Sequence, residues 1–529
     1  MGIYLNPGNS SFAEILNGNY QDKTGMIGLI NDRICTPDKL VCISRPRRFG
    51  KSYAARMLCA YYDCTCKSEE LFDSLEIAKT KKYRKHMNMY NVIYLDISGI
   101  ISKMATSDIP LRSIASNIKA LINEEIRKSF PNIPQCEDAS DAILELVAAS
   151  NKKVVFIIDE WDAVIREAKD DAATQKVYLE LLREWFKNGN FTSQAVAATY
   201  MTGILPIKKD KSQSAISDFD EGTVLQPGEF SSFIGFTEDE VKVLCDTYGM
   251  SFDEAKYWYD GYAFSDIQSI YNPYSIMRAM RNRVFQSYWQ HTSAAENLET
   301  LININKDGLQ EDILKLIAGE QIVVNTKKFK NDFTSFSSKD DVLTLLIHLG
   351  YLVYDSKTRR VRIPNEEVRF EFDELLQYAQ HTQLAKLIND SEQLLQNTLN
   401  GNETDVVETI KRVRDTNYAP QFYNDEQSLR YVIKFAYIVC IDYYLKVEEL
   451  PTGHGIADVV FIPKRDTSFP AMIVELKWNE TADSAITQIK NRNYPAILNG
   501  YGGELVLVGI NYDQKTKDHS CKIDRIYIE

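Results

Sequence analysis

The sequence predicts an α/β multidomain protein, and three observations support this. The chain has 529 residues, which exceeds one ordinary hydrophobic core and implies roughly three or four structural units. Apolar residues make up 44% and charged residues 26% of the chain, close to the averages of globular proteins. Through about residue 205, short apolar runs alternate with helical patterns, which is typical of a doubly wound parallel sheet.

Four apolar runs in this first part predict buried parallel strands, because they are almost continuously apolar rather than alternating. They are KLVCIS (39–44), NVIYLDIS (91–98), KKVVFIID (152–159) and AVAATYMTG (195–203). The segments between them have apolar residues three and four apart, which predicts helices that cover the sheet. The clearest are SYAARMLCAYY (52–62), LRSIASNIKALINEEIRK (111–128) and TQKVYLELLREWFKN (174–188).

The rest of the chain divides by a change of pattern. Residues 229–330 are mainly helical, with a capping box expected at Thr237 to Glu240. Residues 331–375 include a helix, strand, turn and strand that predict a winged-helix-like module, whose wing either contacts nucleic acid or only packs between larger domains. A polar helical bridge over 376–420 leads to a last α/β domain at 421–529, and residues 1–228 form the first domain.

Composition limits the compartment and the partners. Nine cysteines are scattered without a repeated CxxC spacing, which predicts reduced thiols in the cytoplasm and argues against zinc. The N-terminus has no basic start followed by an apolar run, and no stretch is long enough to cross a bilayer. A formal net charge of −13 excludes a protein coated with basic surface, but it allows a local basic groove.

The stretch SRPRRFGKS (44–52) ends as a phosphate-binding loop does. Such a loop needs backbone N–H groups, a lysine for the terminal phosphates and a hydroxyl for Mg²⁺ at the start of a helix. Residues 47–52 supply these, and the candidate nucleotide ligands are Arg47, Arg48, Phe49, Gly50, Lys51 and Ser52. Arg45 stands where glycine normally permits tight curvature. The three loop arginines either add positive charge toward phosphate or lie on a solvated loop.

Two acids follow the third predicted strand. Asp159 ends KKVVFIID and Glu160 comes next, in the order in which ATPases place a Mg²⁺ ligand and a base that polarises the attacking water. Thr202 ends the fourth strand, where it either senses the γ-phosphate or only caps the strand. Together with Gly-Lys-Ser in an α/β chain, these residues predict a nucleotide site with ATP and Mg²⁺ as ligands.

At this point the chain resembles a known family. The motifs YQDKTGMI (20–27), SRPRRFGKS (44–52), FIIDEWDA (156–163), MTGILPI (201–207), FTEDEV (236–241), WYDGYAF (258–264), YNPYSI (271–276) and IPNEEVR (363–369) occur in order. This series is similar to the bacterial AAA-ATPase-like family that carries a C-terminal PD-(D/E)XK nuclease domain. The resemblance implies Lys51 and Ser52 on phosphates and Mg²⁺, Asp159 on Mg²⁺ and Glu160 as base, and Arg45 is usual in it.

The last domain has its own candidate site. Asp458 lies in the strand GIADVVFIP, and Glu475 and Lys477 lie in AMIVELKW. Residues two apart in a strand share a face, and a lysine among apolar neighbours is costly unless it has a partner or a role. Metal-dependent phosphodiester cleavage needs carboxylates for one or two Mg²⁺ ions and a lysine that activates water. A plain ion pair on a strand face is the alternative.

The resemblance adds further residues to this site. The order helix, three strands, helix, strand around Asp458 is the core of PD-(D/E)XK nucleases. Gln488 and Tyr494 resemble the family's following helix, where they contact the phosphate backbone or position Lys477, and Glu426 resembles an extra metal ligand. Ile456 departs from the arginine common at its position, which puts one DNA-phosphate contact in doubt.

The expected function is therefore an ATP-binding and ATP-hydrolysing protein coupled to a metal-dependent nuclease, with Mg²⁺ or Mn²⁺ at the nuclease site. Nucleic acid is the expected partner, DNA rather than RNA, together with a homo-oligomer and no membrane. The alternative is an ATP-switched regulatory protein whose nuclease-like domain docks nucleic acid or protein without cleavage. Among the single residues, His348 is expected in the core and His454 in a surface loop.

Overall fold

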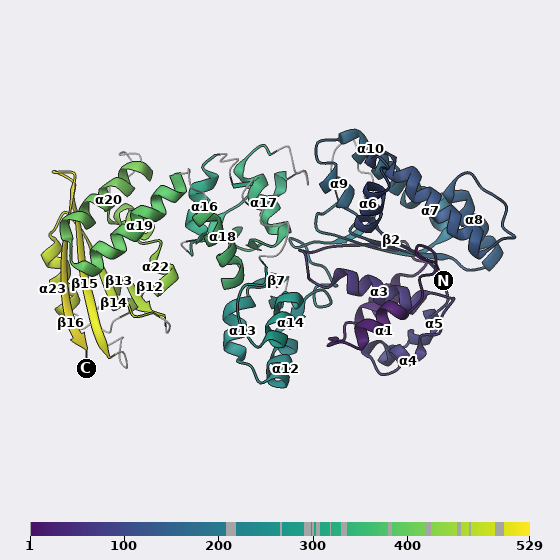
Figure 1. The fold of residues 1–529 in the computed structure, drawn as a ribbon, viewed down its shortest axis with the longest axis horizontal. Coiled ribbons are helices and arrows are strands. Elements are labelled where there is room, and N and C mark those ends of the chain that lie inside the picture. Colours follow the sequence, from purple (N-terminus) through teal and green to yellow (C-terminus); the bar gives the residue numbers. More distant parts are fainter. Residues whose placement is uncertain are drawn as a thin grey trace. The chain divides into compact units, whose positions relative to one another are not determined.

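A computed structural model of the chain describes residues 2–207, 218–264, 267–289, 298, 301–302, 307–317, 319–329, 336–378, 383–417, 425–451, 456–464, 467–491 and 502–528. The chain forms two compact units (Figure 1). The first unit comprises Met1–Leu309 and Gln321–Glu371, and the second comprises Gln310–Glu320 and Phe372–Glu529. The five predicted domains and the four boundaries between them stay predictions. No helix in the described ranges combines the length and apolar character needed to cross a membrane.

The first unit is built on a five-stranded parallel sheet in the order β2-β3-β4-β1-β5. Its strands are β1 (Leu40–Ser44), β2 (Asn91–Asp96), β3 (Val154–Asp159), β4 (Val196–Gly203) and β5 (Asp220–Gly222). The first four confirm the strands predicted from continuous apolar runs, and nearly all their residues are buried. The fifth strand, β5, was not predicted, since three residues at a sheet edge leave no periodic signal.

Helices cover both faces of this sheet, which confirms the doubly wound prediction. In Figure 1, α1, α3, α4 and α5 lie on one side of the strands, and α6 to α10 lie on the other. The helices are α1 (Ser10–Leu16), α2 (Gly25–Arg33), α3 (Lys51–Tyr62), α4 (Glu69–Phe72), α5 (Tyr83–His86), α6 (Ile97–Thr106), α7 (Ile114–Ser129), α8 (Ala139–Ser150), α9 (Ala163–Glu167), α10 (Ala172–Phe186) and α11 (Gly189–Ala195). Two 3₁₀ turns lie at Glu76–Lys79 and Leu111–Ser113.

The strand order decides which side chains meet at the carboxyl edge of the sheet. Because β4 lies between β1 and β3, its last residues neighbour both the end of β1 and the end of β3. Thr202 is paired with Ile43 of β1, and Met201 is paired with Ile158 of β3. Asp159 therefore comes level with Thr202, one strand away from the loop that follows Ser44. Ligands of open parallel sheets bind outside this edge.

The remainder of the first unit contains two small sheets and their helices. One sheet has the order β6-β8-β7 and the other β10-β11-β9, all antiparallel. The helix and two strands predicted for the winged-helix-like module are present as α17, β10 and β11, and the predicted capping box joins Thr237 and Glu240. The elements are β6 (Phe236–Thr237), α12 (Glu238–Tyr248), α13 (Phe252–Tyr259), β7 (Tyr262–Phe264), β8 (Ile267–Tyr271), α14 (Pro273–Asn282), β9 (Ile322–Val323), α17 (Lys339–Leu349), β10 (Val353–Asp355), β11 (Arg360–Arg362) and α18 (Glu366–Tyr378), with a 3₁₀ turn at Thr326–Lys328.

The second unit holds a five-stranded mixed sheet in the order β12-β13-β14-β15-β16. Only β14 and β15 are parallel to each other. The strands are β12 (Tyr444–Pro451), β13 (Ile456–Pro463), β14 (Ala471–Trp478), β15 (Gly503–Asp513) and β16 (Asp518–Ile528). The helices are α16 (Leu309–Ile317), α19 (Gln383–Asn400), α20 (Glu403–Asn417), α21 (Glu426–Ala436), α22 (Cys440–Tyr443) and α23 (Ala482–Asn491).

Two details of this unit differ from the sequence-based expectation. The pattern DEQSLRYVIKFAYIVCIDYYL (425–445) predicts one continuous helix before the strands, but α21 ends at Ala436, the short α22 follows, and β12 begins at Tyr444. The last strand, β16, was not expected, because most of its residues are only partly buried, as on the edge strand of a sheet. The expected order of helix, three strands, helix and strand is otherwise confirmed.

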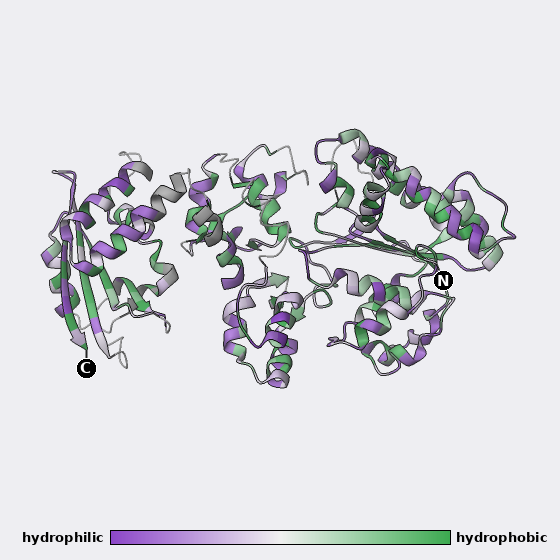
Figure 2. Ribbon diagram, in the orientation of Figure 1, coloured by the Kyte–Doolittle hydropathy of each residue, from purple (hydrophilic) through white to green (hydrophobic). Residues whose placement is uncertain are grey.

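The hydropathy pattern explains these layers. In Figure 2 the sheet strands are largely hydrophobic, while most helices carry both hydrophobic and hydrophilic residues. The core of the first unit includes the fully buried rings of Trp161 and Trp185. His348 is 1% exposed on α17 and stacks on Phe329, as expected for a core histidine. All nine cysteines are free thiols, in line with the reduced state expected from their spacing.

Candidate functional site

The candidate phosphate-binding loop connects β1 to α3. Gly50 has a left-handed backbone with φ of +91°, and no protein atom lies within 4 Å of the position that a Cβ atom would take. Arg48 also has a left-handed backbone, with φ of +68°. Lys51 is the first residue of α3, which places the candidate lysine at the positive end of a helix of 12 residues. The loop therefore has the strand, turn and helix context that the sequence predicted.

Lys51 is directed back onto this loop. Its ammonium donates hydrogen bonds to the carbonyl oxygens of Arg45 at 2.9 Å and Pro46 at 2.7 Å. Burial lowers the pKa of Lys51 to about 8, and the nearby carboxylate of Asp159 opposes that shift. A buried ammonium that is held only by carbonyl dipoles can exchange them for stronger acceptors, and phosphate oxygens are such acceptors.

Arg45 does not take either of the two positions expected for it. It is fully buried, with 0% exposure, so it neither reaches toward phosphate nor lies in solvent. Its guanidinium donates to the carbonyl oxygens of Ser44 (3.1 Å), Gly222 (2.9 Å) and Pro227 (3.1 Å), and it stacks over the Phe264 ring at 4.5 Å. Arg45 therefore fixes the start of the loop to β5 and β7.

The other loop residues differ in where their side chains lie. The Arg48 guanidinium lies 3.9 Å from the centre of the Tyr274 ring and donates to the Tyr288 carbonyl at 2.9 Å. Phe49 is buried and packs edge-on against Tyr262. Burial lowers the pKa of Arg47, and the positive charge of Arg166 lowers it further. The carboxylates of Glu160 and Asp162 oppose this lowering.

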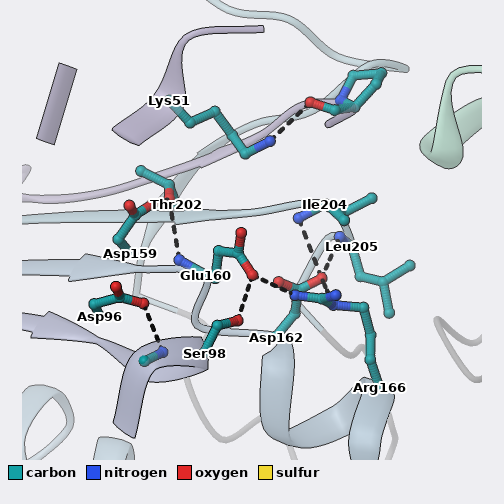
Figure 3. A network of polar contacts seen from close by, with 12 residues as sticks. Lys51, Asp96, Ser98, Asp159, Glu160, Asp162, Arg166, Thr202, Ile204 and Leu205 are labelled. Carbon is teal, nitrogen blue, oxygen red and sulfur yellow. Dashed lines mark hydrogen bonds and ion pairs between the residues drawn. The ribbon is translucent and has the colours of Figure 1, made fainter. Parts of the chain in front are cut away.

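Asp159 is the centre of a cluster formed by β3, β4 and α3 (Figure 3). It is 4% exposed and accepts hydrogen bonds from the hydroxyls of Thr202 and Ser52. Burial raises the pKa of Asp159 despite these bonds and the charge of Lys51. Thr202 also accepts a hydrogen bond from the Glu160 amide at 3.3 Å. A carboxylate beside a serine hydroxyl suits Mg²⁺, which takes few protein ligands and keeps positions for phosphate and water.

Glu160 is held in a defined and strained position. Its backbone is left-handed, with φ of +53°, a conformation that is costly for a residue other than glycine and concentrates at functional sites. Its carboxylate accepts hydrogen bonds from the hydroxyl of Ser98 on α6 and from Arg166 at 2.8 Å. Burial pushes the pKa of Glu160 upward, but the Ser98 bond and the charge of Arg166 outweigh it and lower the pKa.

Three residues of this network were not found from the sequence. Ser98 follows β2, Asp162 is the N-cap residue of α9, and Arg166 lies four residues later in the last turn of α9. Asp162 is fully buried and accepts from the amides of Ile204 and Leu205 at 3.1 and 3.0 Å. The only signal in the sequence is the i, i+4 spacing of Asp162 and Arg166, which also occurs on many solvent-exposed helices.

A second cluster lies on β13, β14 and α23 of the second unit. Val459 pairs with Val474, so the antiparallel register brings Asp458 opposite Glu475. Both are buried, with 6% and 2% exposure. Asp458 accepts a hydrogen bond from the Leu476 amide at 2.8 Å. Because opposite residues of antiparallel strands share a face, the two carboxylates and Lys477 come to one side of the sheet, as the sequence predicted.

Gln488 connects the lysine to the acid. Its side-chain oxygen accepts from the Lys477 ammonium at 2.7 Å, and its side-chain amide donates to Glu475. Lys477 and Glu475 are 3.8 Å apart. The resemblance implied that Gln488 either contacts the phosphate backbone or positions Lys477. Its hydrogen bonds to Lys477 and Glu475 are those of a positioning residue.

One further residue contacts this second cluster, and the roles predicted for three others stay predictions. Arg430 on α21 forms an ion pair with Asp458 at 2.5 Å and was not found from the sequence. Glu426, one helical turn earlier, is exposed and lies 3.9 Å from Arg430, and its role as a metal ligand stays a prediction. Tyr494 and His454 lie outside the described residues.

In the part of the chain that the structure describes, no group of three or more His, Cys, Asp or Glu side chains forms a complete metal site. The carboxylates that are present still suit divalent metals that share their coordination with a substrate. Asp159 with Ser52 fits Mg²⁺ on a nucleotide, and Asp458 with Glu475 fits Mg²⁺ or Mn²⁺, because hard cations prefer oxygen ligands.

Comparisons with known proteins match the two regions of the chain that contain these clusters. Residues 7–212 match the family model described as "Predicted AAA-ATPase", and residues 424–520 match that of the PD-(D/E)XK nuclease superfamily. Along the whole chain, the protein is 22% identical over 538 residues to an "Uncharacterized protein in vnfD 5'region" of Azotobacter chroococcum mcd 1, with 96% of each chain covered.

Two solved structures show weak similarity. The ORC2 protein of Aeropyrum pernix, in ADPNP-ADP complexes, is 11% identical with a TM-score of 0.27, over 67% of this chain and 93% of that one. CDC6P of Pyrobaculum aerophilum is also 11% identical, with a TM-score of 0.26, over 68% and 94%. Scores this low support no conclusion about function. By the two family models, the chain joins a domain of the AAA-ATPase-like family to a C-terminal domain of the PD-(D/E)XK nuclease superfamily.

Proposed function

We propose that the first unit binds and hydrolyses ATP with Mg²⁺, and that the nucleotide state controls metal-dependent cleavage of DNA by the second unit. The observation that carries this proposal is a pair of side-chain clusters. One joins Lys51, Asp159 and Glu160 at the carboxyl edge of a parallel sheet. The other joins Glu475, Lys477 and Gln488 on β14 and α23.

In the ATPase half, each residue has a role that follows from its position. Lys51 would leave the carbonyls of Arg45 and Pro46 and neutralise the terminal phosphates. Ser52 and Asp159 would hold Mg²⁺ beside those phosphates. Glu160 would accept a proton from the attacking water, and Thr202 would hold Asp159 while it contacts the Glu160 amide.

In the nuclease half, Asp458 and Glu475 would hold the divalent metal. A bound metal supplies charge stabilisation at the scissile phosphate and lowers the pKa of a water molecule. Lys477, positioned by Gln488 at 2.7 Å, would orient the attacking water and stabilise negative charge on the phosphate. Asp458 would exchange its ion pair with Arg430 for the metal, because a divalent cation competes effectively for a carboxylate.

The test is a digestion panel of DNA and RNA with Mg²⁺ or Mn²⁺, with and without ATP. It compares the wild type with Lys51→Ala and Lys477→Ala, and with Lys490→Ala as matched control. Lys490 lies on α23 and forms an exposed ion pair with Asp524, so its loss removes a lysine of the same region outside the cluster. The expected result is metal-dependent DNA cleavage by the wild type. Lys477→Ala should abolish this cleavage and Lys490→Ala should preserve it. Cleavage by Lys51→Ala should no longer respond to ATP.

A second candidate function is an ATP-switched protein that docks nucleic acid without cutting it. The ion pair between Arg430 and Asp458 favours this candidate, since the arginine neutralises that carboxylate without a metal ion. Binding of DNA without metal, and no cleavage under any nucleotide condition, would select this second candidate. Wild-type cleavage by Lys477→Ala would remove the assignment of the nuclease site.

A further inference from the structure

Arg166 has an unusual position for a helix residue of the first unit. It projects from α9 back toward the carboxyl edge of the sheet, and Figure 3 shows it beside Glu160 and Asp162. Its terminal nitrogen lies 2.8 Å from Glu160, and its Nε lies 3.4 Å from Asp162. Only 12% of the side chain is exposed. A buried arginine between two acids is well stabilised as a cation.

The charge of Arg166 acts on the phosphate-binding loop as well. Its guanidinium is near enough to lower the pKa of both Lys51 and Arg47. Three cations therefore act on one loop, and the nearby carboxylates of Asp159, Glu160 and Asp162 offset part of their mutual repulsion. The triphosphate of ATP, whose proposed site is this loop, would add further negative charge beside these cations.

The bond to Glu160 cannot persist during hydrolysis. A carboxylate that accepts hydrogen bonds from Arg166 and Ser98 is a poor base, because both bonds stabilise its ionised form. Asp162 does not need Arg166 to the same degree, since it also accepts two backbone amides from Ile204 and Leu205. The contact that must change is the one between Arg166 and the base.

A base acts through a water that lies within hydrogen-bond distance of both the base and the γ-phosphate. A cation in contact with Glu160 is consequently only one or two hydrogen-bond lengths from that phosphate. Arginine is suited to the position, because its planar fork binds phosphate oxygens in pairs and stays protonated.

We propose that Arg166 is a catalytic residue of the ATPase, supplied by the same chain, which moves from Glu160 to the γ-phosphate when ATP binds. This inference rests on the proposed ATPase function. The water oxygen forms a bond to the γ-phosphorus while the bond to the bridging oxygen breaks. ADP leaves with that electron pair, Glu160 takes the proton of the water, and Arg166 keeps its protons and neutralises charge on the transferred group. The same movement frees the base.

The experiment measures ATP hydrolysis, ATP binding and trapping of ADP with aluminium fluoride, which mimics the transferred phosphate. The full-length variants are Arg166→Ala and Arg166→Lys, with Arg84→Ala as matched control. Arg84 is exposed and pairs with Asp73 at 2.8 Å, so its loss reports only the effect of removing an ion-paired arginine from the same unit.

The expected result for Arg166→Ala is a loss of kcat of about 10³-fold, as for other arginines that contact the transferred phosphate. ATP affinity should change by less than about tenfold, and trapping of ADP with aluminium fluoride should disappear. Arg166→Lys keeps a charge between the two acids and preserves the fold. We expect it to hydrolyse ATP at least about tenfold more slowly than the wild type, because an ammonium lacks the planar fork.

Unchanged or faster hydrolysis by either variant, with trapping intact, would overturn this role and leave Arg166 as a holder of Glu160. If Arg166→Ala fails to fold in a thermal-unfolding assay, the rate and trapping of Arg166→Lys decide the question. A wild type that hydrolyses no ATP under any condition would remove the proposed ATPase itself, which is a different outcome from a wild type and Arg166→Lys of equal activity.

Discussion

Arg45 stands where phosphate-binding loops commonly have glycine, and we expect that restoring glycine there destabilises the protein. From the sequence alone, Arg45→Gly should improve the phosphate-binding loop, because it creates the usual GxxxxGKS pattern. In the folded chain it removes a fully buried guanidinium that holds three backbone carbonyls. Gly222 and Pro227 would then lose their contact with the start of the loop.

The magnitude follows from these contacts. A hydrogen bond from a charged donor contributes about 1.5–3 kcal/mol, and a desolvated cation–π contact such as that with Phe264 at 4.5 Å contributes about 2 kcal/mol. The desolvation of the guanidinium costs several kcal/mol in return. Glycine also adds about 0.5–1 kcal/mol of backbone entropy to the unfolded chain. We expect a net loss of about 4 kcal/mol in the free energy of unfolding, since deletion leaves buried carbonyls without donors.

The assay is urea unfolding of the full chain, combined with hydrogen exchange of the β1 and β5 backbone. Arg45→Met is the matched variant, because methionine fills much of the volume but donates no hydrogen bond. Both variants should lose protection of β5 first, and Arg45→Gly should be the less stable of the two. Wild-type stability together with tight ATP binding in Arg45→Gly would refute the reasoning, because Arg45 would then be an ordinary loop residue.

Three further predictions concern stability. Burial raises the pKa of Glu367 to about 7 from an ordinary 4.5, so between these pH values the folded state binds a proton that the unfolded state releases. The free energy of unfolding should therefore fall as pH rises through this range. Urea unfolding from pH 4 to 8 should show a flatter slope for Glu367→Gln. Burial lowers the pKa of His348 from 6.5 to about 3; stability should fall as pH drops below 6.5, and an equal acid sensitivity of His348→Phe would contradict this. Gly261 has φ of +122° and its Cβ position is 1.9 Å from the Pro364 oxygen; Gly261→Ala should lower the melting temperature far more than Gly249→Ala, whose Cβ position is open at φ of +62°, and equal effects would contradict this.

The sequence by itself determined most of the strands and helices, and it indicated the candidate site residues. The first four parallel strands came from local apolar runs, which depend only on neighbouring residues. Lys51, Asp159, Glu475 and Lys477 could be found because their chemistry requires short, fixed spacings within one element and its adjoining loop. Such information is contained in a few consecutive residues, and it needs no knowledge of which strands are neighbours.

Only the tertiary structure decided how these parts are combined. The placement of β4 between β1 and β3 brings Thr202 to Asp159, and no local period specifies the order of strands. Arg45 became a buried anchor because Gly222 and Phe264, more than 170 residues away in the chain, close around it. Arg430 on α21 reaches Asp458 on β13 for the same reason. Burial and charge pairing depend on distant segments, and a side chain's surroundings are therefore fixed by packing rather than by its neighbours in sequence.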